Sequence, residues 1–152
     1  MRISAKVDYA VRAAIELAAA GDEELTKADA IARAQEIPPK FLENILGDLR
    51  QGGLVRSQRG AEGGYKLARP AAEITIADII RVVEGPMAAV RGGRPEDVSY
   101  DGNAEPLQRV WIAVRSALRQ VAEHVTLADL ASGRLPPQVE KLTADPDAWL
   151  TH

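Results

Sequence analysis

The change from helix to hairpin falls within residues 41–65, which read FLENILGDLRQGGLVRSQRGAEGGY. The first part has apolar side chains at the helical spacing i, i+3, i+4 and i+7, at Leu42, Ile45, Leu46 and Leu49. The second part has two short strand-like runs around a glycine-rich connection, which is typical of a hairpin. The segment therefore predicts a helix from Pro39 to about Gln51, ended by Gly52 and Gly53 with positive φ, and then a β-hairpin.

Two more helices are expected before this segment. Apolar residues at helical spacing predict a first helix that Gly21 stops: Ile3, Val7, Ala10, Val11, Ala14, Ile15 and Ala18. Thr26 and Asp29, in the pattern T-K-A-D, predict a capping box that opens a second helix. Three short helices followed by a basic hairpin predict a mainly α fold, a winged helix-turn-helix with a small β-hairpin wing.

The rest of the chain predicts a flexible loop at 86–105 and, beyond it, a second functional part. Thr75 and Asp78 are expected to cap a helix that ends at Gly85, and Thr126 and Asp129 a short helix that Gly133 closes. Beyond Pro106, apolar residues recur in steps of four and three, which is typical of a helix packed along a partner helix. This predicted homodimer interface comprises Leu107, Trp111, Val114, Leu118, Val121 and Val125.

These patterns divide the chain into four parts. They are a DNA-binding domain at 1–85, a flexible loop at 86–105, a dimerisation helix and short helix at 106–133, and a tail at 134–152. No apolar run approaches the roughly 20 residues that span a bilayer. Lys6 and Asp8 stand where a signal peptide would be apolar. We therefore expect a cytoplasmic protein with no membrane partner.

The composition argues against an enzyme and against a cofactor. The chain has no cysteine, which excludes disulfides, thiolate nucleophiles and cysteine-ligated metal clusters. Its two histidines, His124 and His152, are too far apart in sequence to suggest a local metal site. No nucleophile motif or phosphate-binding loop is present. We expect no enzymatic activity and no cofactor.

The distribution of charge favours a nucleic-acid partner, although the net charge is -3. Residues 50–69 contain five basic residues, Arg50, Arg56, Arg59, Lys66 and Arg69, against the single acid Glu62. Acids collect instead at 22–24 and 96–101. A basic strip on an acidic body is suited to contacts with the phosphates of double-stranded operator DNA.

The third helix and the hairpin supply the expected contacts. Lys40, Glu43 and Asn44 face outward in the first turns of the helix, and glutamate accepts from cytosine while asparagine pairs with adenine. Arg59 beside Gly60 at the hairpin tip is placed to enter a minor groove, and Gly63 and Gly64 would let the backbone approach phosphates. Each feature alone is also typical of solvated surface or an ordinary turn, but together they favour DNA binding.

Three segments carry a resemblance to a known family: MRISAKVDYAVRA, FLENILGDLRQGGLVRSQRGAEGGYKLAR and ITIADIIRVVEGP. Over about residues 1–133 the chain resembles the Rrf-two-type winged-helix transcription regulators. The resemblance implies a reading helix that uses Lys40, Phe41, Glu43 and Asn44, a wing arginine at Arg59, and phosphate contacts at Ser4 and Lys6. Phe41 has an alternative role, which is to pack on the neighbouring helix.

The cluster-binding members of this family carry three cysteines in the loop after E-G-P. Here that loop reads MAAVRGGRPEDVSYDGNAE, so no thiolate is available, and Asp8, which resembles a helix-one ligand, has a plainer role as a favourable charge near a helix N-terminus. The resemblance then points to the cluster-free, cysteine-metabolism branch. It implies a repressor of sulfur-uptake and cysteine-synthesis genes whose partner is the cysteine-synthesis enzyme O-acetylserine thiol-lyase.

Two other functions stay open at this point. One is a small-molecule receptor whose pocket lies between the long helix and the winged domain, lined by Trp111, Met87 and Val90. The other is a protein-interaction module that has lost DNA binding, for which the acidic net charge is the best argument.

Overall fold

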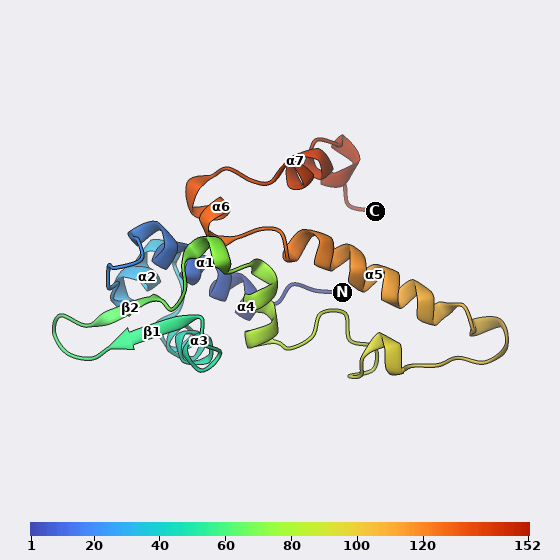
Figure 1. Cartoon of the computed structure of the whole chain (residues 1–152), viewed down its shortest axis with the longest axis horizontal. Coiled ribbons are helices and arrows are strands. Elements are labelled where there is room, and N and C mark those ends of the chain that lie inside the picture. Colours follow the sequence, from blue (N-terminus) through green and yellow to red (C-terminus); the bar gives the residue numbers. More distant parts are fainter.

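The structure is a computed structural model that describes residues 1–152. It confirms a mainly α fold with one small antiparallel sheet (Figure 1). The helices and strands are α1 Ala5–Ala20, α2 Ala28–Gln35, α3 Pro39–Gln51, β1 Val55–Gln58, β2 Gly64–Leu67, α4 Ile76–Val83, α5 Leu107–Ala122, α6 Leu127–Ser132 and α7 Pro137–Thr143.

The core lies around α1, which packs against α2, α3, α4, α6 and β2. The four apolar residues predicted for α3, Leu42, Ile45, Leu46 and Leu49, are all buried there. Their partners include Leu17 of α1 and Ile31 of α2. Because one face of α3 is anchored in this core, its opposite face must lie at the surface of the molecule.

Helix α6 belongs to the same core, although it lies far along the chain. The Leu127 amide donates to the Ile74 carbonyl at 2.9 Å, and the Ile76 amide donates to the Val125 carbonyl at 3.0 Å. Leu127 is fully buried in the core, and α6 packs on α1. The sequence pattern groups α6 with the long helix, whereas the structure packs it in the winged-helix body, defined here as α1 to α4, the hairpin and α6.

Two of the three predicted capping boxes are confirmed and one is wrong. Thr75 with Asp78 and Thr126 with Asp129 form both reciprocal hydrogen bonds, at 2.9 and 3.1 Å in each case. Thr26 does not cap α2, because its amide and carbonyl are both paired with Tyr65 at 2.8 Å. The helix therefore begins two residues later and has no side-chain cap.

Two smaller expectations at helix ends are also wrong. Ile3 lies before α1 and is 82% exposed, because Ser4 is the N-cap and the helix begins after it. Gly52 has a φ of -76° and only Gly53, with a φ of 75°, adopts the positive value. A Cβ at Gly52 would lie 2.6 Å from Val82, so packing against α4 requires this glycine.

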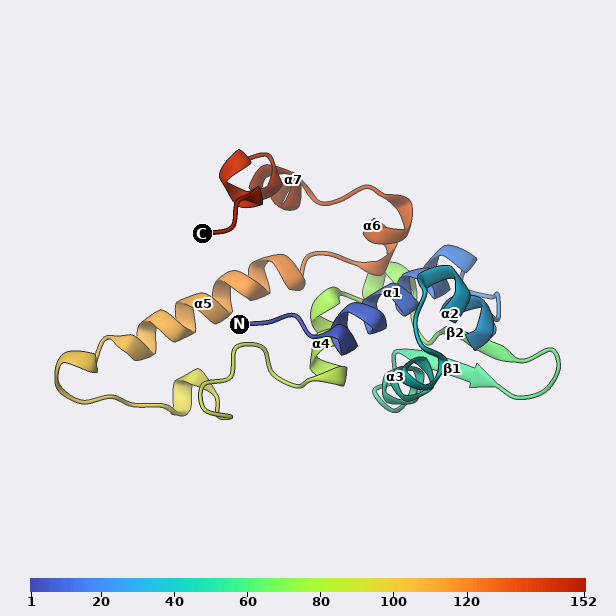
Figure 2. The same cartoon turned by 180° about the vertical axis from the view of Figure 1, so that it is seen from behind.

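The long helix α5 extends away from the body (Figures 1 and 2). It ends at Ala122, so Val125 is not part of its apolar seam, and this part of the predicted dimer interface is wrong. Val125 is buried in the connection to α6, where its carbonyl accepts from Ile76. Before α5, residues 87–105 contain two short 3-10 turns, and Pro95 and Val98 are buried. No helix is long and apolar enough to cross a membrane.

Candidate nucleic-acid interface

The outer face of α3 presents the polar residues expected of a reading helix. Lys40, Glu43 and Asn44 are exposed in its first two turns, opposite the buried leucines and isoleucine. Gly47 continues this face one turn further on, and a Cβ built on it would have no atom within 4 Å. The surface around Gly47 is therefore open, and nothing inside the protein requires a glycine there.

Phe41 packs on the neighbouring helix and is also open to solvent. Its ring meets that of Tyr9 in α1 edge-on, with 6.4 Å between the centroids. The side chain is nevertheless 58% exposed. The contact with α1 holds the ring beside the start of α3, where its exposed part lies next to Lys40 and Glu43 in the sequence.

The wing is a short antiparallel hairpin held against the segment before α2. Its strands pair from Val55 with Leu67 to Gln58 with Gly64. A Cβ at Gly63 would lie 2.1 Å from the Gln58 carbonyl oxygen, and one at Gly64 would lie 2.8 Å from the Thr26 carbonyl oxygen. The packing of the wing on itself and on Thr26 thus requires both glycines, whether or not phosphates also approach them.

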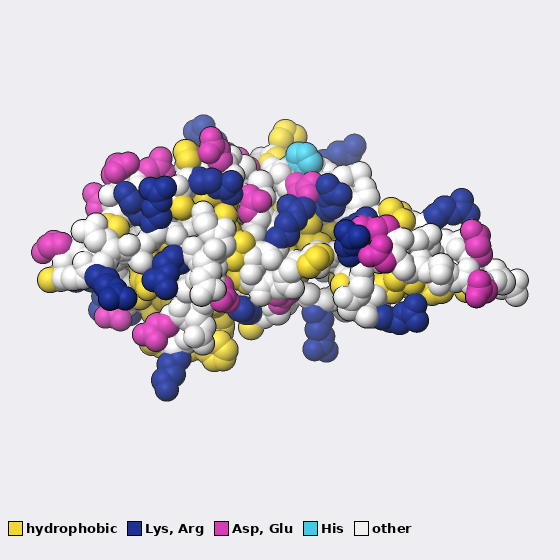
Figure 3. Space-filling model, turned by 60° about the horizontal axis from the view of Figure 1, so that its bottom comes forward, with side chains coloured by type: hydrophobic (Ala, Val, Ile, Leu, Met, Phe, Trp, Pro, Cys, Tyr) yellow, Lys and Arg dark blue, Asp and Glu magenta, His cyan; other side chains and the backbone are white.

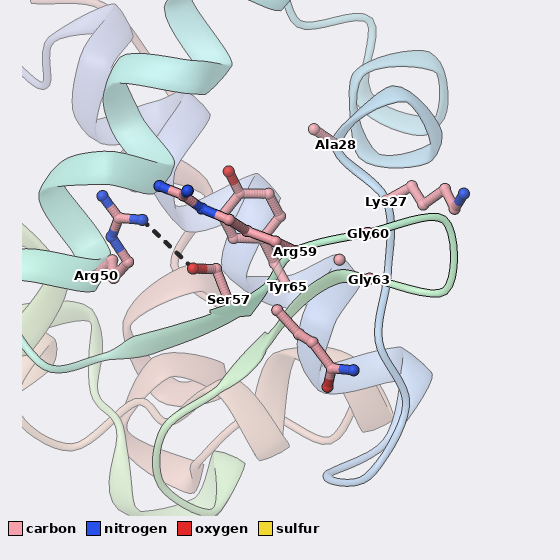
Figure 4. Close-up of a pocket in the computed structure, with 10 residues that line it drawn as sticks. Lys27, Ala28, Arg50, Ser57, Arg59, Gly60, Gly63 and Tyr65 are labelled. Atoms are coloured by element: carbon pink, nitrogen blue, oxygen red, sulfur yellow. Dashed lines mark hydrogen bonds between the residues drawn. The ribbon is translucent and has the colours of Figure 1, made fainter.

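A hollow of about 320 Å³ lies between the wing, the end of α3 and the start of α2 (Figure 4). Three cationic residues line it, Lys27, Arg50 and Arg59, together with Ser57 and the glycines of the wing. Arg50 donates to the Ser57 hydroxyl at 3.4 Å, and Arg59 points back across the hollow toward them. Guanidinium groups, a hydroxyl and exposed backbone are the donors that bind phosphate oxygens in DNA complexes.

Lys27 is the member of this hollow that the sequence reading missed. Its Nζ donates to the Ala61 carbonyl at the tip of the wing, at 2.7 Å. Together with the two Thr26–Tyr65 backbone bonds, this contact fixes the wing relative to α2. A lone lysine before a helix gives no sequence signal for such a role, because the contact spans 34 positions of the chain.

Ser4 and Lys6, which the family resemblance assigns to phosphate contacts, already have partners within the chain. The Ser4 hydroxyl accepts from the Val7 amide at 3.1 Å and donates to Glu84. Lys6 pairs with Asp48 of α3 at 2.7 Å, and its side chain is 43% exposed. A phosphate at this end of α1 would compete with the Asp48 carboxylate for Lys6.

Basic side chains are mixed with acidic and apolar ones on the face seen in Figure 3, so no large surface of a single charge forms. Many of the cations outside the hollow are neutralised by ion pairs. The Glu123 carboxylate, directly after α5, forms ion pairs with Arg119 of α5, at 2.9 Å, and with Arg81 of α4. Hydrogen bonds from Arg119 and then Arg81 lower the pKa of the Glu123 carboxyl below its ordinary value.

The structure corrects the predicted small-molecule pocket beside α5. A hollow of about 220 Å³ does lie there, and Met87 lines it, but Trp111 and Val90 do not. Trp111 instead donates to the Tyr100 hydroxyl at 3.2 Å. The other lining residues are mostly charged, at Arg81, Glu96, Arg115 and Arg119, so this hollow differs in its lining from the pocket of Trp111, Met87 and Val90 that the sequence left open.

No group of three or more histidine, cysteine, aspartate or glutamate side chains is placed to hold a metal ion. Asp8, the residue that resembles a helix-one ligand, lies 3.0 Å from the guanidinium of Arg12 in an i, i+4 pair. With no cysteine in the chain, its donor set does not fit an iron–sulfur cluster.

Comparison with known proteins gives one consistent result. The family model Rrf2, described as an iron-dependent transcriptional regulator, matches residues 3–133. An HTH-type transcriptional regulator of Mycobacterium tuberculosis is 51% identical over 145 residues, covering 95% of this chain and 90% of the relative. CymR of Bacillus subtilis is 41% identical over 133 residues, covering 87% of this chain and 91% of CymR.

Solved structures agree with the relatives found by sequence. The structure of B. subtilis CymR, described as the global cysteine regulator, matches with a TM-score of 0.74 and 39% identity, over 88% of this chain and 98% of CymR. IscR of T. potens matches with a TM-score of 0.70 and 31% identity, over 100% of this chain and 93% of IscR. These proteins are transcription regulators, not enzymes.

Proposed function

The chain belongs to the Rrf2 family of DNA-binding transcription regulators, and from this premise we propose that it is a homodimeric repressor of genes of sulfur and cysteine metabolism. The observation that carries the proposal is the placement of two different DNA-contacting elements side by side. The exposed polar face of α3 and the cationic hollow beside the wing meet at Arg50, the last basic residue of the helix.

On DNA, the first turns of α3 enter the major groove. Glu43 accepts from cytosine N4 and Asn44 bridges adenine, while Lys40 contacts guanine or a phosphate. Arg59 swings out of the hollow into the neighbouring minor groove, where the negative potential is deepest. Arg50, Ser57 and Lys6 hold phosphates between these two contacts, and the backbone at Gly60 and Gly64 follows the duplex.

A second copy of the chain supplies the other half of the operator contact. Helix α5 has 16 residues but buries only Ala122, and its seam residues Leu107, Trp111, Val114, Leu118 and Val121 remain partly exposed. An apolar stripe of this length is stable in water only when another helix covers it. A symmetric pair of α5 helices would place two reading helices on half-sites about 34–36 Å apart.

The role in cysteine metabolism rests on similarity to CymR, the relative that is described as a global cysteine regulator. The partnership with O-acetylserine thiol-lyase rests on the resemblance alone and stays a prediction. To test it, the two purified proteins are mixed with and without O-acetylserine, and the measurement is whether they elute together as a complex. Since the donors for an iron–sulfur cluster are missing, the regulatory signal does not act through cluster chemistry in this proposal.

Binding to chromosomal fragments across a salt series tests the proposed function. Fragments recovered with the purified protein are titrated at several ionic strengths. Contacts with several phosphates predict that log K falls linearly with log salt, with a slope of about -0.9 for each neutralised phosphate. Failure to retain any fragment at low salt would contradict the proposal, as would affinity that does not change with salt.

A further inference from the structure

The tip of the wing, residues 59–63, has little support from the rest of the molecule. It begins where the pairing of the two strands ends, at Gln58 with Gly64. Within the tip, the Gly63 amide donates to the Gly60 carbonyl at 3.0 Å. Residues 59–62 are all exposed, so packing against the core does not hold the tip in place.

One side chain from outside the wing reaches the tip. The Lys27 ammonium donates to the Ala61 carbonyl at 2.7 Å, and this is the only hydrogen bond or ion pair that joins the tip to another part of the chain. Because the donor is charged, the bond is stronger than one between two neutral groups. The position of the tip relative to the helices thus depends on Lys27.

The backbone of Lys27 is itself held on both sides. Its neighbour Thr26 forms two backbone hydrogen bonds with Tyr65 of β2, both at 2.8 Å. On the other side, the Lys27 carbonyl accepts from the amides of Ala30 and Ile31 in the first turn of α2, at 3.0 and 3.2 Å. Helix α2 packs on α1 and α3. Lys27 therefore connects the tip to the same helices that hold the reading face of α3.

Arg59 is the side chain whose position depends on the tip. It lies two positions before Ala61 and makes no hydrogen bond or ion pair within the chain. In Figure 4 the two cationic side chains extend in opposite directions, Lys27 toward the tip and Arg59 back toward Arg50. Lys27 can therefore influence Arg59 only through the backbone of the tip.

We propose that Lys27 is a positioning residue for operator binding, whose hydrogen bond to Ala61 holds the tip where Arg59 reaches the minor groove while α3 lies in the major groove. The inference rests on the proposed function, in which both elements contact one duplex. Without this bond the tip would adopt further positions, and the apparent affinity would fall in proportion to the fraction of molecules in the binding position.

Operator titration of two Lys27 variants gives the first test. Lys27→Met, which keeps a long side chain but has no donor, should weaken binding by about two- to tenfold, the range for one hydrogen bond. Lys27→Arg should restore most of the affinity, because a guanidinium can also donate to the Ala61 carbonyl. Lys141→Met, which removes the same charge from an exposed site in α7, should bind normally. Unchanged affinity of Lys27→Met would overturn the proposal.

A double-mutant cycle with Arg59→Ala separates positioning from a direct phosphate contact. If Lys27 acts through the tip, Lys27→Met should weaken binding by less than about twofold once Arg59 is absent, so the double variant should bind like Arg59→Ala alone. The same loss in both backgrounds would overturn the proposal, since it is the result expected of a lysine that binds a phosphate by itself. A wild-type chain that binds no operator would instead refute the proposed function.

Discussion

Helices α1 and α5 each have 16 residues, yet the chain covers them very differently. Helix α1 buries Val7, Ala10, Ala13, Ala14 and Leu17, whereas α5 buries Ala122 alone. The same chain thus completes one region by itself and leaves the other incomplete. The difference teaches that the winged-helix body is a self-sufficient fold, whereas the apolar seam of α5 is left uncovered within one chain, which is the basis for the proposed homodimer.

The largest expected effect separates these two regions directly. Leu46 is fully buried in the body, so Leu46→Ala should lower the free energy of unfolding by about 2–5 kcal/mol. Leu118, on the seam of α5, is 36% exposed, so Leu118→Ala should change the stability of the monomer by no more than about 0.5 kcal/mol but weaken the proposed dimer. Urea unfolding of dilute protein and sedimentation measure the two quantities. If both variants lost monomer stability to a similar degree, the distinction between a self-sufficient body and an uncovered α5 would be wrong.

The body could be predicted well from the sequence because its elements are set locally. The spacing of Leu42, Ile45, Leu46 and Leu49, with Pro39 at the helix start, is sufficient for α3, and the polar reading face is what remains on the other side. The capping boxes at Thr75 and Thr126 are likewise local patterns of four residues.

Three of the failures share a physical cause, which is pairing between distant segments. Thr26 has the right neighbours for a cap but is held by Tyr65, and Lys27 reaches the wing tip at Ala61. Val125 continues the heptad spacing but lies in the connection that binds Ile76. No local pattern reports such contacts. The tail gave no clear sequence signal either, because its apolar residues are few and separated by prolines.

Arg59→Ala should weaken operator binding by about 1–3 kcal/mol, the range for a direct groove contact, without altering the fold. The reason is that Arg59 belongs to the self-sufficient body but makes no hydrogen bond or ion pair within it, so its loss affects only what the hollow binds. Fluorescence anisotropy with a labelled operator measures the change. Arg134→Ala, at an exposed site after α6, changes the net charge equally and should bind normally. Equal affinities for Arg59→Ala and wild type would exclude the wing as a reader.

Gly47→Ala should raise stability and lower affinity at the same time. A glycine inside a helix costs roughly 0.5–1 kcal/mol relative to alanine, and nothing in the chain lies within 4 Å of the added methyl group. We infer that close approach of the duplex to α3 is what requires the glycine. Thermal unfolding and operator titration of one preparation give both readings. A variant that is more stable and binds DNA normally would show that the duplex does not approach this turn.

The smallest expected effect concerns Glu123, which links the body to α5. Its pKa is lowered from 4.5 by hydrogen bonds from Arg119 and Arg81, so its ionised form favours the folded state. This contribution is complete above pH 4.5 and disappears as the pH falls through the lowered value. Glu123→Gln should therefore melt slightly below wild type at neutral pH and converge with it in acid. Glu73→Gln, at an exposed carboxylate without an ion pair, should match wild type throughout; a constant Glu123→Gln difference down to low pH would contradict the role of the charge.

Native mass spectrometry of the protein with a recovered operator duplex tests the central claim most directly. A body complete in itself and an α5 completed by a second copy predict complexes that contain two chains for each duplex, with the one-chain complex scarce even when DNA is in excess. A stable complex of one chain with one duplex, present at high abundance and with undiminished affinity, would contradict the account.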